Sequence, residues 1–223
     1  MIRLLILDID GTITERDRSI KTETLASLRK LKNSRREMTL CLVSGNVLPV
    51  MYGIRGIMGI GDILFAENGG ILMKDGLIEK FFDPGITKMA FQKIKAETGA
   101  TEYITNRWRE TSVAFIPGEK ADYTKYEREF GVRIEDSGFA VHVMNKDQNK
   151  GFAVKKLMEI LNVKEDEILV CGDGDNDISM FRIASLSGCP SNASNRLKEM
   201  STYISERSYG DGLCDILEHF SLI

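Results

Sequence analysis

The sequence predicts an α/β protein: a doubly wound parallel-sheet core with a smaller α+β domain inserted into it. Short, wholly apolar runs that end in polar side chains are typical of strands buried on both faces of a parallel sheet. Segments with apolar residues three or four positions apart alternate with these runs and predict covering helices. Between residues 83 and 148 the predicted elements follow the order helix, strand, strand, and this order occurs twice, which indicates a separate αββαββ unit.

Size and composition bound the class of protein. The chain has 223 residues, 43% of them hydrophobic and 28% charged, which suffices for a large domain and a smaller one. A net charge of -3 argues against nucleic-acid or membrane-surface partners. The four cysteines form no C-x-x-C pair, and no run approaches the ~20 apolar residues of a membrane span. With polar motifs already at residue 8, a cleavable signal peptide has no room, so we expect a reduced, cytoplasmic protein.

The core is expected to comprise residues 1–82 and 149–223. Its first part contains strands, helices and a hairpin with an Asp-Gly turn. In order these are strand Leu4–Leu7, helix Thr22–Asn33, strand Met38–Val43, a helix opened by Pro49, strand Asp62–Ala66, and a hairpin of Ile71–Met73 with Leu77–Phe82. Its second part has a helix after Lys150-Gly151, strands Ile168–Cys171 and Leu186–Cys189, and two terminal helical stretches.

Residues 83–148, called the insert below, are expected to form a domain of their own. The predicted elements are helix 87–97, strands 101–105 and 112–116, helix 119–130, and strands 132–136 and 139–144. Two helix–hairpin units differ in kind from the strand–helix alternation on either side. The insert therefore predicts a second domain within the first.

Polar side chains follow three of the predicted core strands. Asp8 and Asp10, Ser44, and Asp173 each stand where an apolar run ends, and Lys150 opens a helix. In open α/β sheets ligands bind beyond the carboxyl ends of the strands, so one edge of the sheet could collect these groups. Carboxylates, a lysine and a hydroxyl suit a divalent cation with a phosphate, and oxygen ligands alone favour Mg²⁺. The sequence thus predicts a magnesium and phosphate site.

These motifs resemble those of the haloacid dehalogenase-like superfamily of phosphohydrolases. The matching segments are Asp8-Ile9-Asp10-Gly11-Thr12, Ser44-Gly45-Asn46, Lys150 and Gly172–Asp177. The resemblance implies a Rossmann-like core, and the position of the insert resembles that of a C2-type cap, a domain that sets substrate specificity. The short cap and Asn46 are similar to archaeal-type phosphoglycolate phosphatases. Asn192-Ala193 and Tyr209–Gly212 extend the resemblance to nearly the whole chain.

The resemblance implies a role for each matched residue. Asp8 would be the nucleophile that becomes an aspartyl-phosphate, and Asp10 the general acid and then base. Mg²⁺ would be held by Asp8, the carbonyl of Asp10, Asp173 and Asp177. The substrate-binding residues would be Ser44, Gly45, Asn46, Lys150 and Asn176. The implied reaction is Mg²⁺-dependent hydrolysis of a small phosphorylated metabolite, 2-phosphoglycolate, to glycolate.

Other functions remain open on the same scaffold. A sugar-phosphate phosphatase and a phosphotransferase or mutase fit these motifs, since a fold does not set its substrate. A phospho-aspartate signalling module fits less well, because it needs neither Asp10 nor the insert. Monomer and homodimer both remain open. Arg107, Arg109 and His142 are candidates for reading the substrate, and we expect Arg107 or Arg109 to meet its carboxylate when the cap closes.

Overall fold

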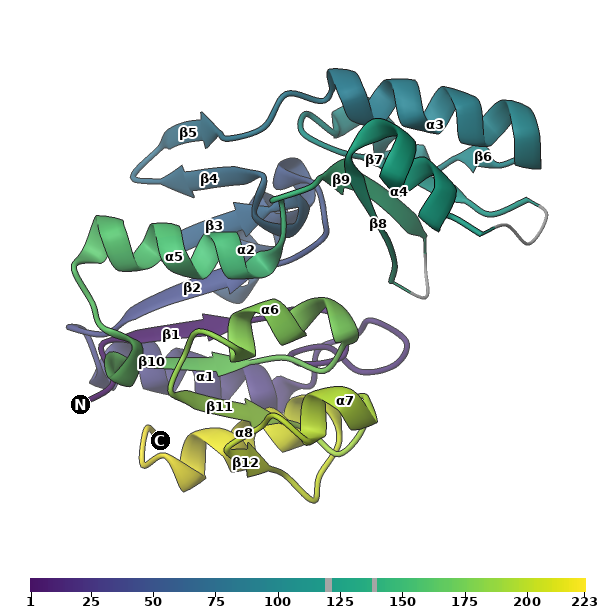
Figure 1. The fold of residues 1–223 in the computed structure, drawn as a ribbon. Helices are drawn as coiled ribbons and strands as arrows, with labels where there is room; N and C mark the ends of the chain where they lie inside the picture. The colour runs from purple at the N-terminus through teal and green to yellow at the C-terminus, as the bar shows by residue number, and fades with distance from the viewer. Residues whose placement is uncertain (119–121, 138–139) are drawn as a thin grey trace.

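The computed structural model describes residues 1–118, 122–137 and 140–223. Figure 1 shows an eight-stranded sheet of order β12-β11-β10-β1-β2-β3-β4-β5 and a four-stranded sheet of order β6-β7-β9-β8. The strands from β12 to β3 are all parallel, as the sequence predicts for the core. The predicted α/β class is confirmed.

The large sheet and its helices come from both sides of the insert. Its strands are β1 (Leu4–Leu7), β2 (Thr39–Val43), β3 (Ile63–Ala66), β4 (Ile71–Lys74), β5 (Leu77–Lys80), β10 (Ile168–Cys171), β11 (Leu186–Cys189) and β12 (Tyr203–Ile204). Its α-helices are α1 (Thr22–Ser34), α2 (Leu48–Met58), α5 (Lys150–Leu161), α6 (Ile178–Phe181), α7 (Asn195–Lys198) and α8 (Tyr209–His219). Within the described ranges no helix is long and apolar enough to cross a lipid bilayer.

Strand β1 shows why helices cover both faces of the large sheet. Successive side chains of a strand point to opposite faces. Leu5 and Leu7 pack in one cluster with side chains of α1, α2 and α8, and Leu4 and Ile6 pack in another with side chains of α5 and α6. All four leucine and isoleucine side chains are fully buried. The unbroken apolar run of this strand is thus explained by two covered faces.

The predicted hairpin is confirmed and extends the large sheet. Strand β4 pairs antiparallel with β3, and β5 pairs with β4. Asp75 and Gly76 both have positive φ, 51° and 79°, as a two-residue turn with the twist of the strands requires. The core sheet is therefore parallel with an antiparallel edge.

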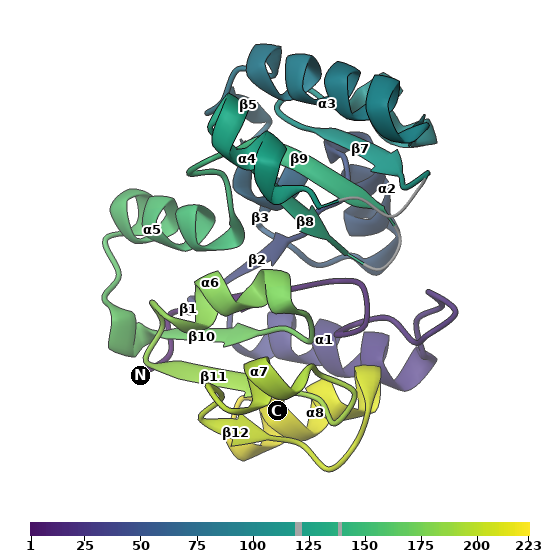
Figure 2. The ribbon, with the colours of Figure 1, turned by 45° about the vertical axis from the view of Figure 1, so that its right-hand side comes forward.

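The insert forms the small sheet with two α-helices on its outer side (Figures 1 and 2). The strands are β6 (Thr101–Glu102), β7 (Val113–Ile116), β8 (Val132–Asp136) and β9 (Val141–Asn145), and the helices are α3 (Gly85–Thr98) and α4 (Thr124–Phe130). Phe91 and Ile94 of α3 pack against Phe115 of β7 and Val143 of β9. The predicted αββαββ order is present, and the sheet lies between its helices and the core (Figure 2).

Two predicted boundaries of the insert differ in the structure. The strand predicted to reach Thr105 stops at Glu102, and a 3-10 helix (η2) follows over Ile104–Trp108. The side chain of Asn106 accepts a hydrogen bond of 2.7 Å from the backbone N–H of Ala114, which replaces a strand partner there. The second helix begins at Thr124, and the part of it predicted over 119–121 lies outside the described residues, as does the predicted strand start at 139.

Candidate active site

Polar side chains at the carboxyl ends of β10, β1 and β2 line one cavity of about 570 Å³, called the strand-end cavity here. These three strands are neighbours in the sheet, so their ends meet at one edge. The core side of the lining includes Asp8, Asp10, Ser44, Gly45, Asn46, Asp173 and Asn176, and the insert side includes Tyr103, Thr105, Arg109 and His142. The structure thus brings these predicted site residues together and sets the insert opposite them.

Lys150 and Asp177 are not among the residues that line the strand-end cavity, and Lys150 bridges Asp177 and Asp8. The ammonium of Lys150 donates to Asp8 Oδ1 at 2.5 Å and to Asp177 Oδ1 at 2.6 Å. Lys150 is 1% exposed, because it stands in the first turn of α5 and points at the sheet edge. Burial lowers the pKa of its ammonium, but the two carboxylates outweigh burial and raise that pKa above its ordinary value. Lys150 is therefore a permanent cation beside Asp8.

Asp8, Asp173 and Asp177 form a carboxylate cluster that fits a divalent cation. One oxygen of each lies within 4.8 Å of the others. Burial, followed by the nearby Asp177, raises the pKa of Asp173 to about 7, and burial likewise raises the pKa of Asp8 against the opposing effect of Lys150. When all three carboxylates are ionised, one ammonium leaves two negative charges unbalanced. A donor set that consists only of oxygen atoms and carries excess negative charge suits Mg²⁺.

Asp173 and Asp177 are held in different ways. Asp177 Oδ2 accepts from the backbone N–H groups of Asp173 and Gly174, both at 3.0 Å, so this side chain also fixes the loop. Asp173 is contacted by Thr12 Oγ1 at 3.4 Å and by Asn192 Nδ2 at 3.3 Å. Thr12 and Asn192 are not among the site residues predicted from the sequence. The polar residues that follow β11 could have pointed to Asn192.

Gly11 is required where the backbone passes the carboxylate cluster. Its φ is +87°, a backbone conformation that residues other than glycine rarely adopt. A Cβ atom there would lie 2.2 Å from Asp173 Oδ2. Gly11 therefore allows the segment Asp8–Thr12 to approach the segment Gly172–Asp177 closely.

Ser44, Gly45 and Asn46 form a loop next to Asp10. Asn46 Nδ2 donates to Asp10 Oδ2 at 2.6 Å and to Ser44 Oγ at 3.1 Å. Ser44 Oγ also accepts from the backbone N–H of Asn46 at 3.1 Å. A hydroxyl that accepts twice still has its own hydrogen to donate, so Ser44 can bind an anionic oxygen. Asn46 orients Asp10.

On the insert side Arg109 and Arg107 differ sharply. Arg109 is 9% exposed and lines the strand-end cavity, whereas Arg107 is exposed and is not among the lining residues. The guanidinium of Arg109 donates to the carbonyl of Gly45 and to Ser112 Oγ, both at 3.0 Å. Its Nε is buried and has no partner among the residues that the structure describes. An arginine of this kind can still donate to a ligand in the cavity.

His142 of β9 also faces the strand-end cavity and is 6% exposed. Its Nε2 lies 3.2 Å from Ser137 Oγ, while its buried Nδ1 has no partner in the described part of the chain. Burial, and then the charges of Arg109 and Lys150, lower the pKa of His142 from 6.5 to about 3. The ring is therefore neutral at physiological pH.

This shift predicts a pH-dependent stability. Between pH 6.5 and 3 the unfolded chain binds a proton at His142 that the folded chain does not, so stability falls as pH is lowered. Acidification from pH 6.5 to 4.5 should lower the free energy of unfolding through His142 by about 2–3 kcal/mol. His142→Asn should abolish this part of the pH dependence in denaturant titrations, and the same change at the exposed His219 should not. Identical pH profiles for wild type and His142→Asn would contradict the assignment.

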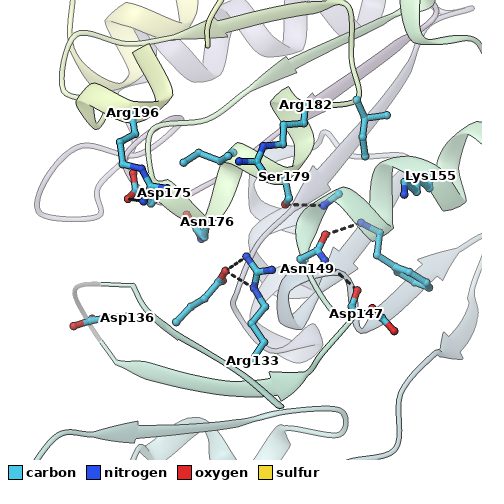
Figure 3. A pocket seen from close by; sticks show the side chains of 15 residues that line it. Arg133, Asp136, Asp147, Asn149, Lys155, Asp175, Asn176, Ser179, Arg182 and Arg196 are labelled. Atoms are coloured by element: carbon cyan, nitrogen blue, oxygen red, sulfur yellow. Dashed lines mark hydrogen bonds and ion pairs between the residues drawn. The ribbon is translucent and has the colours of Figure 1, made fainter. Parts of the chain in front are cut away.

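A wider cleft of about 750 Å³ lies beside the strand-end cavity, between β8 and helices α5 and α6 (Figure 3). Asn176 lines both spaces. Two ion pairs line the wider cleft, Arg133 with Glu135 on the insert and Arg196 with Asp175 on the core, and neither joins the two domains. The lining does not include the carboxylate cluster. The strand-end cavity is therefore the better candidate for the active site, although the wider cleft has the larger volume.

The chain is similar to proteins of one known family. The sequence profile of the haloacid dehalogenase-like hydrolases matches residues 5–137 and 118–217. A phosphoglycolate phosphatase of Picrophilus torridus is 46% identical over 226 residues, covering 100% of this chain and 93% of the relative. One of Thermoplasma acidophilum is 42% identical and covers 100% of both. A crystal structure of a Thermoplasma acidophilum protein superimposes with a TM-score of 0.92 at 39% identity, covering 100% of both chains.

Proposed function

The chain belongs to the haloacid dehalogenase-like hydrolases, and from that membership we propose that it hydrolyses 2-phosphoglycolate to glycolate through an aspartyl-phosphate on Asp8, with Mg²⁺ as cofactor. Phosphatase activity follows from the family and from relatives that bear the name phosphoglycolate phosphatase. The substrate and the mechanism are the further steps of the proposal. One observation carries them: Asp8, Asp10 and Arg109 line the same strand-end cavity.

Asp8 and Asp10 divide the chemistry between them. Asp8 attacks phosphorus, and the bond from phosphorus to the ester oxygen breaks as the aspartyl-phosphate forms. Asp10, oriented by Asn46, gives its proton to the leaving glycolate oxygen. The same carboxylate then takes a proton from water, which attacks phosphorus and releases phosphate and free Asp8. General acid and base catalysis of this kind contributes typically ~10²–10⁴ in rate.

The surrounding groups let one anion approach another. A carboxylate and a phosphate oxygen ~4 Å apart repel each other by about 4 kcal/mol at a partly exposed site. Lys150 already donates to Asp8, and in this proposal its ammonium also takes a phosphoryl oxygen, while Ser44 has a hydroxyl hydrogen to donate. Mg²⁺, held by Asp8, the carbonyl of Asp10, Asp173 and Asp177, would supply the remaining positive charge.

We propose that the insert acts as the specificity cap and that Arg109 binds the substrate carboxylate. The core groups recognise only phosphate and metal, so discrimination among esters must come from the opposite wall. A carboxylate that leaves water needs a cation or several donors, and Arg109 offers both. Arg107 is exposed and does not line the strand-end cavity, so it is not part of the proposal. Of the three insert residues that the sequence offers for reading the substrate, Arg109 is the one proposed to bind the carboxylate, and neutral His142 lines the same cavity.

A substrate panel tests the proposal. Phosphate release should be measured for phosphoglycolate, sugar phosphates and an aryl phosphate whose aryl group is uncharged (called the neutral aryl phosphate here), with Mg²⁺ and with chelator. The highest kcat/KM should be found for phosphoglycolate. A clear preference for a sugar phosphate would reject the substrate while leaving the phosphatase activity intact.

Arg109→Ala tests the recognition of the carboxylate. KM for phosphoglycolate should rise about tenfold or more, because a hydrogen-bonded charge pair is lost, while KM for the neutral aryl phosphate changes little. Arg107→Ala is the matched control and should retain wild-type KM for both esters. Equal losses for both esters in Arg109→Ala would contradict the assignment.

A further inference from the structure

Glu67 is a buried carboxylate that the reaction described above does not use. It directly follows β3 and is 0% exposed. Its φ is +52°, a conformation that is uncommon for residues other than glycine and that persists only where surrounding contacts hold it. A carboxylate so far from water must be compensated by hydrogen bonds or by positive charge.

The insert supplies that compensation. Glu67 Oε1 accepts from the backbone N–H of Glu110 at 2.8 Å. Glu67 Oε2 accepts from the backbone N–H and hydroxyl of Thr111, at 3.0 and 2.9 Å, and from Ser112 Oγ at 2.7 Å. Four donors from three consecutive residues of the insert thus converge on one core side chain. We call this set of contacts the Glu67 junction.

The junction lies between the Ser44–Asn46 loop and Arg109. On the core side, the backbone N–H of Glu67 donates to the carbonyl of Asn46 at 2.9 Å. On the insert side, Arg109 directly precedes the three donor residues and donates to Ser112 Oγ at 3.0 Å. Ser112 therefore accepts from Arg109 and donates to Glu67, so that arginine, hydroxyl and carboxylate form a relay.

We propose that Glu67 is a positioning residue that fixes Arg109 over the Ser44–Asn46 loop and so sets the affinity for esters that carry a second anionic group. The inference deepens the proposed function and rests on the role given there to Arg109. Arg109 is already tied to the carbonyl of Gly45, and its neighbours in the chain are tied to Glu67. The specificity arginine is thus anchored to the core and need not wait for a moving cap to place it.

Glu67→Gln is a sharp test because the two oxygens accept from different backbone N–H groups, those of Glu110 and Thr111. Glutamine has one carbonyl oxygen, so its amide nitrogen must face one of these N–H donors in either orientation. KM for phosphoglycolate should rise about tenfold with kcat within threefold, and KM for a neutral aryl phosphate should stay within threefold. Glu110→Gln, which removes only the exposed ion pair to Lys80, is the matched control and should behave as wild type.

A double-mutant cycle separates positioning from general destabilisation. If Glu67 acts through Arg109, Glu67→Gln in an Arg109→Ala background should add less than threefold to KM. Additive effects, or equal losses for both esters, would overturn the proposal. Should Glu67→Gln not fold, Ser112→Ala breaks the relay and keeps both backbone hydrogen bonds. It should raise KM for phosphoglycolate alone, and unchanged KM would overturn the proposal.

A substrate-free measurement keeps this inference distinct from the proposed function. Should wild type show no preference for phosphoglycolate, the proposed substrate fails, and amide hydrogen exchange of Glu110 and Thr111 decides the junction. Exchange should be at least tenfold faster in Glu67→Gln than in wild type, because an amide that loses its buried acceptor opens more readily. Equal exchange in the two proteins would show that Glu67 does not hold this segment.

Discussion

Asp8→Asn should lower kcat by about 10⁴ or more while leaving the fold and substrate binding intact. The amide cannot form the phosphorylated intermediate, and losing a nucleophile is among the largest single effects known in catalysis. The fold should persist because Lys150 keeps its 2.6 Å contact with Asp177 and the asparagine oxygen can still accept from it. Removing one charge from a cluster with excess negative charge should also relieve repulsion.

Steady-state phosphate release, thermal unfolding and calorimetric binding of phosphoglycolate would together check this prediction. Asp17→Asn is the control, because Asp17 is an exposed carboxylate that bonds Ser19 and does not line the strand-end cavity. It should retain activity within about twofold, as expected for a surface change. A tenth of wild-type activity in Asp8→Asn would rule out the covalent mechanism.

Removal of the metal should abolish turnover, and Asp173→Asn should mimic that loss. Chelator should stop phosphate release and added Mg²⁺ should restore it. In Asp173→Asn the Mg²⁺ concentration for half-maximal activity should rise about 100-fold, since a charged ligand is replaced by a neutral one in a small set. Asp173 is a cleaner choice than Asp177, whose side chain also holds the loop backbone.

Thermal unfolding gives a readout of the metal that does not depend on catalysis. A ligand that binds only the folded state raises its stability by mass action, so Mg²⁺ should raise the Tm of wild type and hardly affect Asp173→Asn. Without metal, Asp173→Asn should be at least as stable as wild type, because Asp177 no longer repels a charge there. Asp175→Asn is the control, since Asp175 lies in the same loop and pairs with Arg196. Full wild-type activity in excess chelator would exclude the metal site.

The order of strands and helices and the core motifs were determined locally by the sequence. An apolar run such as Leu4–Leu7 is buried on both faces wherever a sheet contains it, and polar residues that follow such a run must stand at a strand end. Asp8, Ser44 and Asp173 share this property, so their convergence could be inferred without coordinates. The Asp-Gly hairpin was predictable for the same reason, since turn chemistry depends on two adjacent residues.

Which side chains of the insert line the strand-end cavity depends on contacts between segments that are distant in the chain. Arg107 and Arg109 have the same chemistry and lie two positions apart, so no local pattern distinguishes them. Arg109 is buried, and the residues that follow it are bound by Glu67, more than forty positions earlier in the chain. Glu67 is a glutamate that directly follows a strand, and the side chain of such a residue is ordinarily exposed to solvent. Burial and hydrogen bonding between segments so far apart arise from packing, which no local pattern encodes.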